Sequence, residues 1–314
     1  MRRTRKQRIK EKRYDSSCWI GVASIALFFA LALLGVKVCY SMLASSIVGL
    51  LLLSGLKGSM AVVSTALFSM VSSYDYAVLP MFILMATVIT ETGMGTSLYA
   101  SCRTWLGHLP GGLCLATIIA CAVFAAVTAF PWASIMAVGA IALPEMARYR
   151  YNKQMSLGSI AAGSELGDLI PPSSMFITYG MMTGTSIGTL LISGIVPGLL
   201  MAALYCIVIF AWCKVKPGAG PRGPKTTARE KLLALKDVWA LLVVIIFVMG
   251  GILIGVCTPT EAGALGAALS FIIACFQKKM SLKVFKRILL SAGSMVGMIY
   301  MVISCAMLMK QMIA

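Results

Sequence analysis

The sequence predicts an all-α polytopic membrane protein, and three observations support that fold class. Of its 314 residues, 60% are hydrophobic and 12% are charged, whereas soluble domains contain about 25% charged residues. Apolar runs recur along the whole chain, and several reach the roughly 20 residues with which a helix crosses a bilayer. Most basic residues lie between these runs. A soluble enzyme and a disordered chain are therefore excluded as default interpretations.

The positions of the positive charges predict the orientation of the chain in the lipid bilayer. There are 27 Lys and Arg against 10 Asp and Glu, a net charge of +17. Twenty-three of the 27 lie in four short segments: eight in residues 2–13, three in 148–153, seven in 214–236 and five in 278–287. Basic residues between apolar runs are typical of cytoplasmic segments. The same placement argues against nucleic acid as a partner.

The expected helices follow the apolar runs. Residues 1–17 form a basic cytoplasmic arm, and residues 18–36 form a first membrane helix, because this stretch is too long for a typical signal peptide. The further runs are 40–56, 76–90, 113–130, 132–146, 187–213, 238–256, 262–276 and 288–309. Two of them are short and meet at Phe130-Pro131-Trp132. This junction predicts a re-entrant helical hairpin over residues 113–147, which needs protein or a cavity around its turn.

A basic linker at residues 214–237 divides the chain into a first membrane unit, residues 18–213, and a second, residues 238–314. Its beginning, KVKPGAGPRGPKTTAREK, is rich in Pro, Gly and basic residues. That composition predicts a solvated, flexible loop.

Beyond the linker, Thr258-Pro259-Thr260-Glu261 has the pattern of a capping box and predicts the start of a helix.

Residues 158–180 form an apolar but interrupted segment, which contains GSELGDLIPPSSMFITYG. Pro171 and Pro172 cannot continue a helix, yet Pro is favoured in the first turn of a new one. We therefore expect a helix, a break, and a second half-helix that begins near residues 171–173. Free N–H groups at the new N-terminus favour an anion, and free carbonyls at the first end favour a cation. The alternative is a structural proline kink without a ligand.

Two acidic residues, Glu165 and Asp168, lie three positions apart in this segment and so share one helix face. A charge at mid-membrane costs about 2.5–3.5 kcal/mol on insertion scales, and such residues usually face a cavity and have a function. They predict a site for a cation or a proton. The alternative is that the break lies near an aqueous opening and both carboxylates are simply solvated.

Residues typical of enzymes and metal sites are sparse. The ten cysteines have no metal-ligand spacing and lie mostly inside apolar runs, where Cys serves as a small packing residue. His108 is the only histidine, and no nucleophile–base pair has suitable spacing. We expect neither an enzyme nor a transition-metal site.

Four motifs occur in a distinctive order: LPMFIL at residues 79–84, IPPS at 170–173 with YG at 179–180, SGIVPGLL at 193–200 and TPTEA at 258–262. In order and spacing the chain resembles the large permease subunit of tripartite ATP-independent periplasmic (TRAP) transporters, from about residue 51 onwards. The resemblance implies an elevator-type transporter with two inverted repeats, each carrying a hairpin and a broken helix. Residues 18–213 would be the first repeat. Residues 238–314 would begin a second repeat that we expect to be incomplete.

The resemblance also implies a function. It implies a sodium-coupled secondary transporter in the bacterial inner membrane that imports organic acids such as C4-dicarboxylates. Its partners would be a small TRAP permease subunit and a periplasmic solute-binding protein. Na⁺ would be the coupling ion, and no cofactor is expected. Two alternatives are a truncated fragment that transports nothing and a membrane interaction subunit.

The broken helix and the resemblance together predict the site residues. The expected substrate-binding residues are Thr128, Pro171, Pro172, Ser173 and Ser174. The expected ion-binding residues are Ser134, Ser164, Glu165, Gly167 and Asp168. The family's hairpin tip is rich in Gly and Ser, whereas this chain has Phe130 and Trp132 there. Where Glu165 and Asp168 stand, the family usually has small or apolar residues.

Overall fold

The structure, a computed structural model, describes residues 5–224 and 226–313, and all regular structure in that part of the chain is helical. This confirms the predicted all-α class. The chain divides into two compact units, residues 1–76 with 296–314 (unit 1) and residues 77–295 (unit 2). Within this described part of the chain, four helices are long and apolar enough to cross a membrane: Val38–Met70, Ile187–Val215, Pro259–Phe276 and Leu282–Ile313. A bent pair, Ala228–Lys236 with Trp239–Ile254, would make a fifth span.

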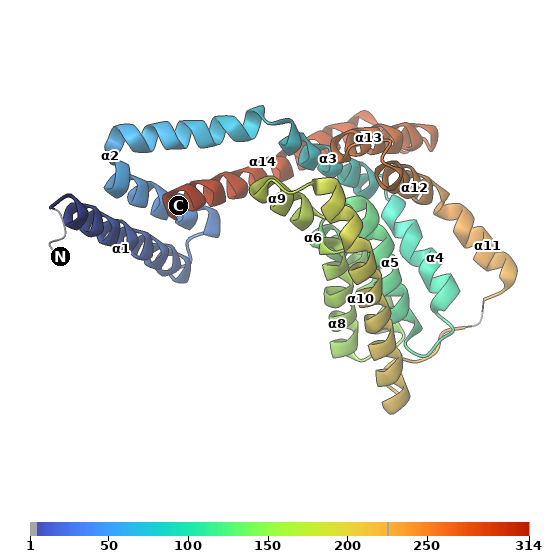
Figure 1. Ribbon diagram of the computed structural model, residues 1–314. Coiled ribbons are helices and arrows are strands. Elements are labelled where there is room, and N and C mark those ends of the chain that lie inside the picture. Colours follow the sequence, from blue (N-terminus) through green and yellow to red (C-terminus); the bar gives the residue numbers. More distant parts are fainter. Residues whose placement is uncertain (1–4, 225, 314) are drawn as a thin grey trace. The chain divides into compact units, whose positions relative to one another are not determined.

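Unit 1 contains helix α1 (Arg5–Leu33), helix α2 (Val38–Ser72) and the C-terminal part of helix α14 (Leu282–Ile313). The apolar part of α1, Trp19–Leu33, is shorter than a full span. Helix α2 bends at Gly55, whose φ of 67° and ψ of 179° are not helical, so that α2 consists of two arms (Figure 1). Only glycine adopts this backbone conformation at little cost.

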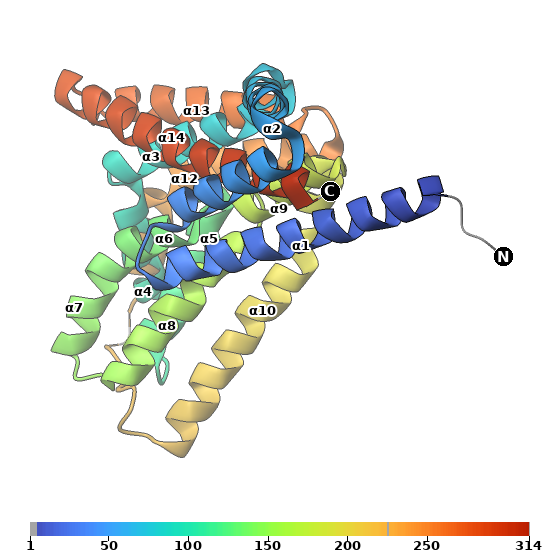
Figure 2. The ribbon, with the colours of Figure 1, turned by 90° about the vertical axis from the view of Figure 1, so that its left-hand side faces the viewer.

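Unit 2 holds the remaining helices, most of which are joined by short turns; the longest connection lies between α10 and α11. They are α3 (Val78–Glu91), α4 (Met94–Leu106), α5 (Gly112–Thr128), α6 (Pro131–Ser134), the π-helical turn η2 (Ile135–Gly139), α7 (Ala140–Arg148), α8 (Lys153–Glu165), the 3₁₀ turn η3 (Leu166–Asp168), α9 (Ser174–Thr183), α10 (Ile187–Val215), α11 (Ala228–Asp237), α12 (Trp239–Ile254) and α13 (Pro259–Phe276). Helix α5 is apolar on all sides and almost wholly buried, as expected for a central helix. It packs against α4, α8 and α10, and Figure 2 shows α7, α8 and α10 side by side.

Helix α13 begins where the sequence predicts. The Thr258 hydroxyl accepts a hydrogen bond from the Glu261 backbone N–H at 3.3 Å, and the Glu261 carboxylate accepts one from the Thr258 N–H at 2.8 Å. The predicted capping box is therefore confirmed. Two glycines of α13, Gly263 and Gly266, lie against side chains of α3, which lets the two helices pack closely.

The start of the basic linker is bound to the protein rather than free in solvent. We call residues 217–224 the strap. Its Ala219 and Gly220 carbonyls accept hydrogen bonds from the Asn152 and Gly111 N–H groups at 2.9 and 3.0 Å. The strap is therefore not fully solvated, because its polar backbone groups find partners in the turns that precede α5 and α8.

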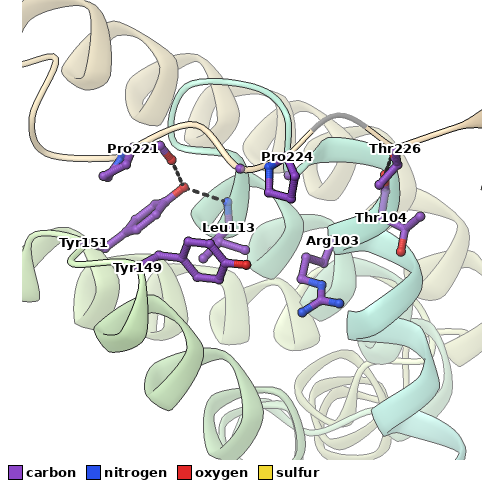
Figure 3. A pocket seen from close by; sticks show the side chains of 10 residues that line it. Arg103, Thr104, Leu113, Tyr149, Tyr151, Pro221, Pro224 and Thr226 are labelled. Carbon is purple, nitrogen blue, oxygen red and sulfur yellow. Dashed lines mark hydrogen bonds between the residues drawn. The ribbon is translucent and has the colours of Figure 1, made fainter.

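A buried tyrosine reinforces the strap. The Tyr151 hydroxyl donates to the Pro221 carbonyl at 2.8 Å and accepts from the Leu113 N–H at 3.3 Å (Figure 3). Arg103 and Tyr149 line the small pocket beside this bridge. The strap thus covers one end of the unit 2 helices.

Candidate substrate and ion site

The first component of the site is the turn between α5 and α6. Helix α5 ends at Ala129, which has a left-handed φ of 60° and donates its N–H to the Ala125 carbonyl at 3.2 Å. Phe130 is extended, and Pro131 takes the first position of α6, where its missing N–H costs nothing. After Ser134 the turn η2 leads into α7, and both pack against α5. The chain therefore returns along α5 within the segment predicted as a hairpin.

The second component is the break between α8 and α9. Its backbone leaves the helix after Asp168, and α9 begins at Ser174 with Ser173 as its N-cap. The Ser173 hydroxyl accepts from the Phe176 N–H at 3.3 Å and donates to the Asp168 carbonyl at 2.6 Å. One buried hydroxyl thus satisfies groups of both half-helices, as a polar break inside an apolar unit requires.

The two components touch through backbone atoms. The Ser174 N–H donates to the Ala129 carbonyl at 3.1 Å, which joins the start of α9 to the hairpin turn. Gly167 lies so close to the turn that a Cβ there would stand 3.1 Å from the Pro131 nitrogen. Two features that are about 40 residues apart in sequence therefore form one site.

Helix α10 supplies residues that the sequence analysis assigned to the family motif but not to the site. A Cβ on Gly194 would lie 2.5 Å from the Leu169 carbonyl oxygen and would overlap the Phe176 ring. A Cβ on Gly198 would lie 2.8 Å from the Ile170 side chain. The Gly-x-x-x-Gly spacing of Gly194 and Gly198 could have identified this contact, since small residues one turn apart permit the close approach of helices in membrane proteins.

Most predicted hydroxyl ligands are already hydrogen-bonded. The Thr128 hydroxyl donates to the Phe124 carbonyl at 3.0 Å, and the Ser164 hydroxyl donates to the Ala161 carbonyl at 2.7 Å. Pro171, Pro172 and Ser173 are buried, while Ser174 is half-buried. At the start of α9, two N–H groups already have partners inside the protein. Fewer donors therefore remain for an anion there than the sequence predicts.

Ser134 differs from Thr128, Ser164 and Ser173, whose hydroxyls are all bonded. Its side chain is fully buried, and its Oγ has no hydrogen-bond partner within the described part of the chain. Such an atom costs about 1–3 kcal/mol unless something satisfies it. It stands at the end of α6, immediately before the π-helical turn η2, and π-helical turns are frequent at functional sites.

The two acidic residues differ in exposure. Glu165 is exposed and Asp168 is half-buried. No salt bridge joins either carboxylate to a basic side chain among the described residues. Asp168 contributes its backbone carbonyl to the break, through the bond from Ser173. The geometry brings Gly167 and Ser174 to the hairpin turn, whereas Asp168 and Ser173 are joined to one another within the break.

The arrangement contains two irregular backbone segments in one buried region, joined by a backbone hydrogen bond and by the close approach of Gly167 to Pro131. Half-helix ends that meet inside a membrane protein are the structural basis of ion and substrate sites in secondary transporters. Comparison with known proteins is consistent with this geometry. The family model described as "Tripartite ATP-independent periplasmic transporter, DctM component" matches residues 25–314.

Individual relatives have different named substrates. The chain is 36% identical over 244 residues to the C4-dicarboxylate TRAP transporter large permease protein DctM of Pseudomonas aeruginosa, covering 77% of this chain and 56% of that protein. It is 33% identical to the ectoine TRAP transporter large permease protein TeaC of Halomonas elongata, covering 76% and 56%. It is 35% identical to the isethionate TRAP transporter permease protein DctMQ of Oleidesulfovibrio alaskensis, covering 76% and 38%.

The chain spans little more than half the length of the first two of these relatives. The family model nevertheless covers more than nine-tenths of the chain itself, and the motifs that carried the resemblance lie within it. This match includes the hairpin turn and the broken helix. It also includes Gly194 and Gly198, which contact the break. The chain therefore belongs to the DctM family of large permease components of TRAP transporters.

Proposed function

We propose that the chain acts in the membrane part of a sodium-coupled secondary transporter that imports organic acids across the bacterial inner membrane. A small permease subunit and a periplasmic solute-binding protein would be its partners. The buried, unpartnered Ser134 Oγ beside the hairpin turn carries the proposal. A hydroxyl that lacks a protein partner is suited to coordinate a cation such as Na⁺.

The remaining ligands of the ion would come from the same region. Thr128 and Ser164 keep free lone pairs, because their hydroxyls donate only to carbonyls of their own helices. Asp168 would add negative charge at the mouth of the site. Hard cations such as Na⁺ prefer oxygen ligands of this kind.

The substrate would bind near the start of α9. The helix N-terminus favours a carboxylate, and Ser174 is the half-buried hydroxyl of that turn. The relatives named for C4-dicarboxylate, isethionate and ectoine have carboxylate or sulfonate compounds as substrates. We therefore propose a small organic anion as the substrate class, with C4-dicarboxylates as the first to test.

Sodium binding can be tested apart from transport. The thermal unfolding of the purified full chain would be compared in NaCl and KCl at equal ionic strength. A ligand that binds only the folded state raises the unfolding temperature, so Na⁺ should stabilise the protein more than K⁺. Ser134→Ala should raise the Na⁺ concentration for half-maximal stabilisation about tenfold, equivalent to about 1.4 kcal/mol.

Ser159→Ala is the matched control, because Ser159 is also a buried serine of unit 2 but its hydroxyl is bonded to the Ser156 carbonyl. It should leave the Na⁺ dependence unchanged. Equal stabilisation of the wild type by Na⁺ and K⁺ would reject sodium. Uptake of labelled succinate by intact cells, which retain the periplasmic solute-binding protein, tests transport itself, with Na⁺ or K⁺ as the external cation. Uptake that is absent with both cations would reject the C4-dicarboxylate proposal.

A further inference from the structure

We propose that Cys39 and Cys305 form a disulfide that joins α2 to α14 within unit 1, on the non-cytoplasmic side of the membrane. Their Sγ atoms are 3.5 Å apart, although the residues are 266 positions apart in sequence. Both are free thiols in the structure. Two sulfur atoms at this distance are in contact, so that small rotations of the side chains bring them to the bonding distance of about 2.05 Å.

Apolar packing holds the two thiols opposite one another. On α14, Cys305 is followed by Leu308 and Met312 at helical spacings of three and seven, which places all three on one face. Leu308 and Met312 are buried together with Leu50 of α2, in a cluster that Leu43 extends toward Cys39. Turning either helix would therefore remove apolar side chains from this cluster along with the thiol.

Polar contacts fix the same register along α14. The Tyr300 hydroxyl donates to the Tyr76 carbonyl at 2.6 Å. The hydroxyl of Ser304, next to Cys305, lies 2.9 Å from the Met70 sulfur. These contacts lie on the side of α14 that faces the end of α2. Sliding of α14 along α2 would break them, so that the approach of Cys305 to Cys39 is set by several independent contacts.

Membrane orientation assigns the pair to an oxidising compartment. Five basic residues in 278–287 predict a cytoplasmic start for α14. Helix α14 is long and apolar enough to cross the membrane, and Cys305 lies 18 residues beyond Arg287, toward the other side. In bacteria the compartment beyond the inner membrane permits disulfides, whereas the cytoplasm keeps thiols reduced.

The reaction is thiol–disulfide exchange with a disulfide oxidant of that compartment. Cys39 is the more exposed thiol and Cys305 is 2% exposed, so Cys39 reacts first. Its thiolate attacks the oxidant's disulfide, forms a mixed disulfide and releases one oxidant thiol. The Cys305 thiolate then attacks the Cys39 sulfur and releases the second. Two cysteine thiols are oxidised, and one oxidant disulfide is reduced to two thiols.

Peptide mapping of the full chain tests the proposal. Free thiols would be alkylated in intact cells before lysis, and the purified protein would be digested with trypsin without reductant. Cleavage after Lys37, Lys57, Arg287 and Lys310 gives peptides 38–57 and 288–310, each with a single cysteine. We expect a linked pair at least tenfold more abundant than alkylated peptide 38–57, and released by reductant.

Cys305→Ser should abolish the linked pair, and Cys39→Ser should do the same. The matched control is Cys275→Ser, which removes an exposed thiol of α13 and should leave the pair intact. Recovery of peptide 38–57 only in alkylated form would overturn the proposal. Linkage that requires oxidised glutathione added after lysis would overturn the assignment to an oxidising compartment. This readout does not depend on transport, so that its failure leaves the proposed function untouched.

Discussion

The break between α8 and α9 and the strap at residues 217–224 are both non-helical segments rich in proline, glycine or both, but their backbone groups are satisfied differently. In the break, one side chain, Ser173, bonds groups on both sides. In the strap, backbone carbonyls accept from other turns, with only Tyr151 as a side-chain partner. In both segments, backbone groups find partners within the protein, as buried polar groups generally do.

The difference lies in their surroundings. The break is enclosed by apolar helices, and residues 158–180 around it carry two acids three positions apart and no basic residue, whereas the strap lies among Lys and Arg residues. Glycines are decisive in both segments, because neighbouring atoms approach where a side chain would otherwise stand. Composition therefore identifies where a helix is interrupted, whereas packing against neighbouring helices and turns decides how tightly the interrupted segment is held.

The largest effect is expected at the break. Gly194→Ala would push a methyl group into the Leu169 carbonyl and the Phe176 ring, and overpacking against backbone should cost about 3 kcal/mol of unfolding free energy. Gly188→Ala on the same helix is the control, because its nearest atoms would be 4.0 Å away. Denaturant unfolding in detergent measures both. Equal stability of the two variants would contradict the tight packing of the break.

The strap should be nearly as sensitive at one glycine. A Cβ on Gly220 would lie 2.8 Å from the Cys213 sulfur and from the Gly111 backbone, so Gly220→Ala should cost about 2 kcal/mol. Gly218→Ala meets nothing within 4 Å and should be close to neutral. Thermal unfolding of the two variants gives the comparison. A flexible strap would be indicated if Gly220→Ala behaved like Gly218→Ala.

A smaller effect is expected when the link between the half-helices is removed. Ser173→Ala deletes both the N-cap of α9 and the bond to the Asp168 carbonyl. Loss of a cap and of a buried hydrogen bond should cost about 1–2 kcal/mol. Ser186→Ala, at the N-cap of α10, is exposed and should cost less. Hydrogen exchange of the α9 amides would show the loss locally, and unchanged protection would argue against the role of Ser173.

The smallest effect is expected at the hairpin turn. Ala129 holds a left-handed φ of 60°, which costs an alanine about 1–2 kcal/mol relative to glycine. Glycine also loses more conformational entropy on folding, about 0.5–1 kcal/mol. Ala129→Gly should therefore stabilise the protein slightly, with a measurable rise in the unfolding temperature. A fall of several degrees would show that the Ala129 methyl group packs usefully in its buried position.

Local sequence features predicted much of the fold and part of the site. The Pro171-Pro172 pair predicted the break, because proline interrupts the helix in which it lies. Helix α9 begins two residues after this pair. The capping box at Thr258 likewise depends on residues that are close in sequence. The sequence also predicted Ser173 and Gly167 as site residues, and both lie in the break. It did not predict that the Ser173 hydroxyl bonds to both half-helices, nor that Glu165 is exposed.

The sequence by itself therefore determined the all-helical membrane class through its composition and apolar runs, and the break through its prolines. It also determined the family through four short motifs. Each of these features can be recognised without knowing which helices meet. Only the tertiary structure decided the contact between Gly194 and Leu169, the binding of the strap, the isolation of Ser134 and the approach of Cys39 to Cys305. These features depend on atoms from separate helices. Which helices meet, and at which turn, is set by the packing of the whole unit.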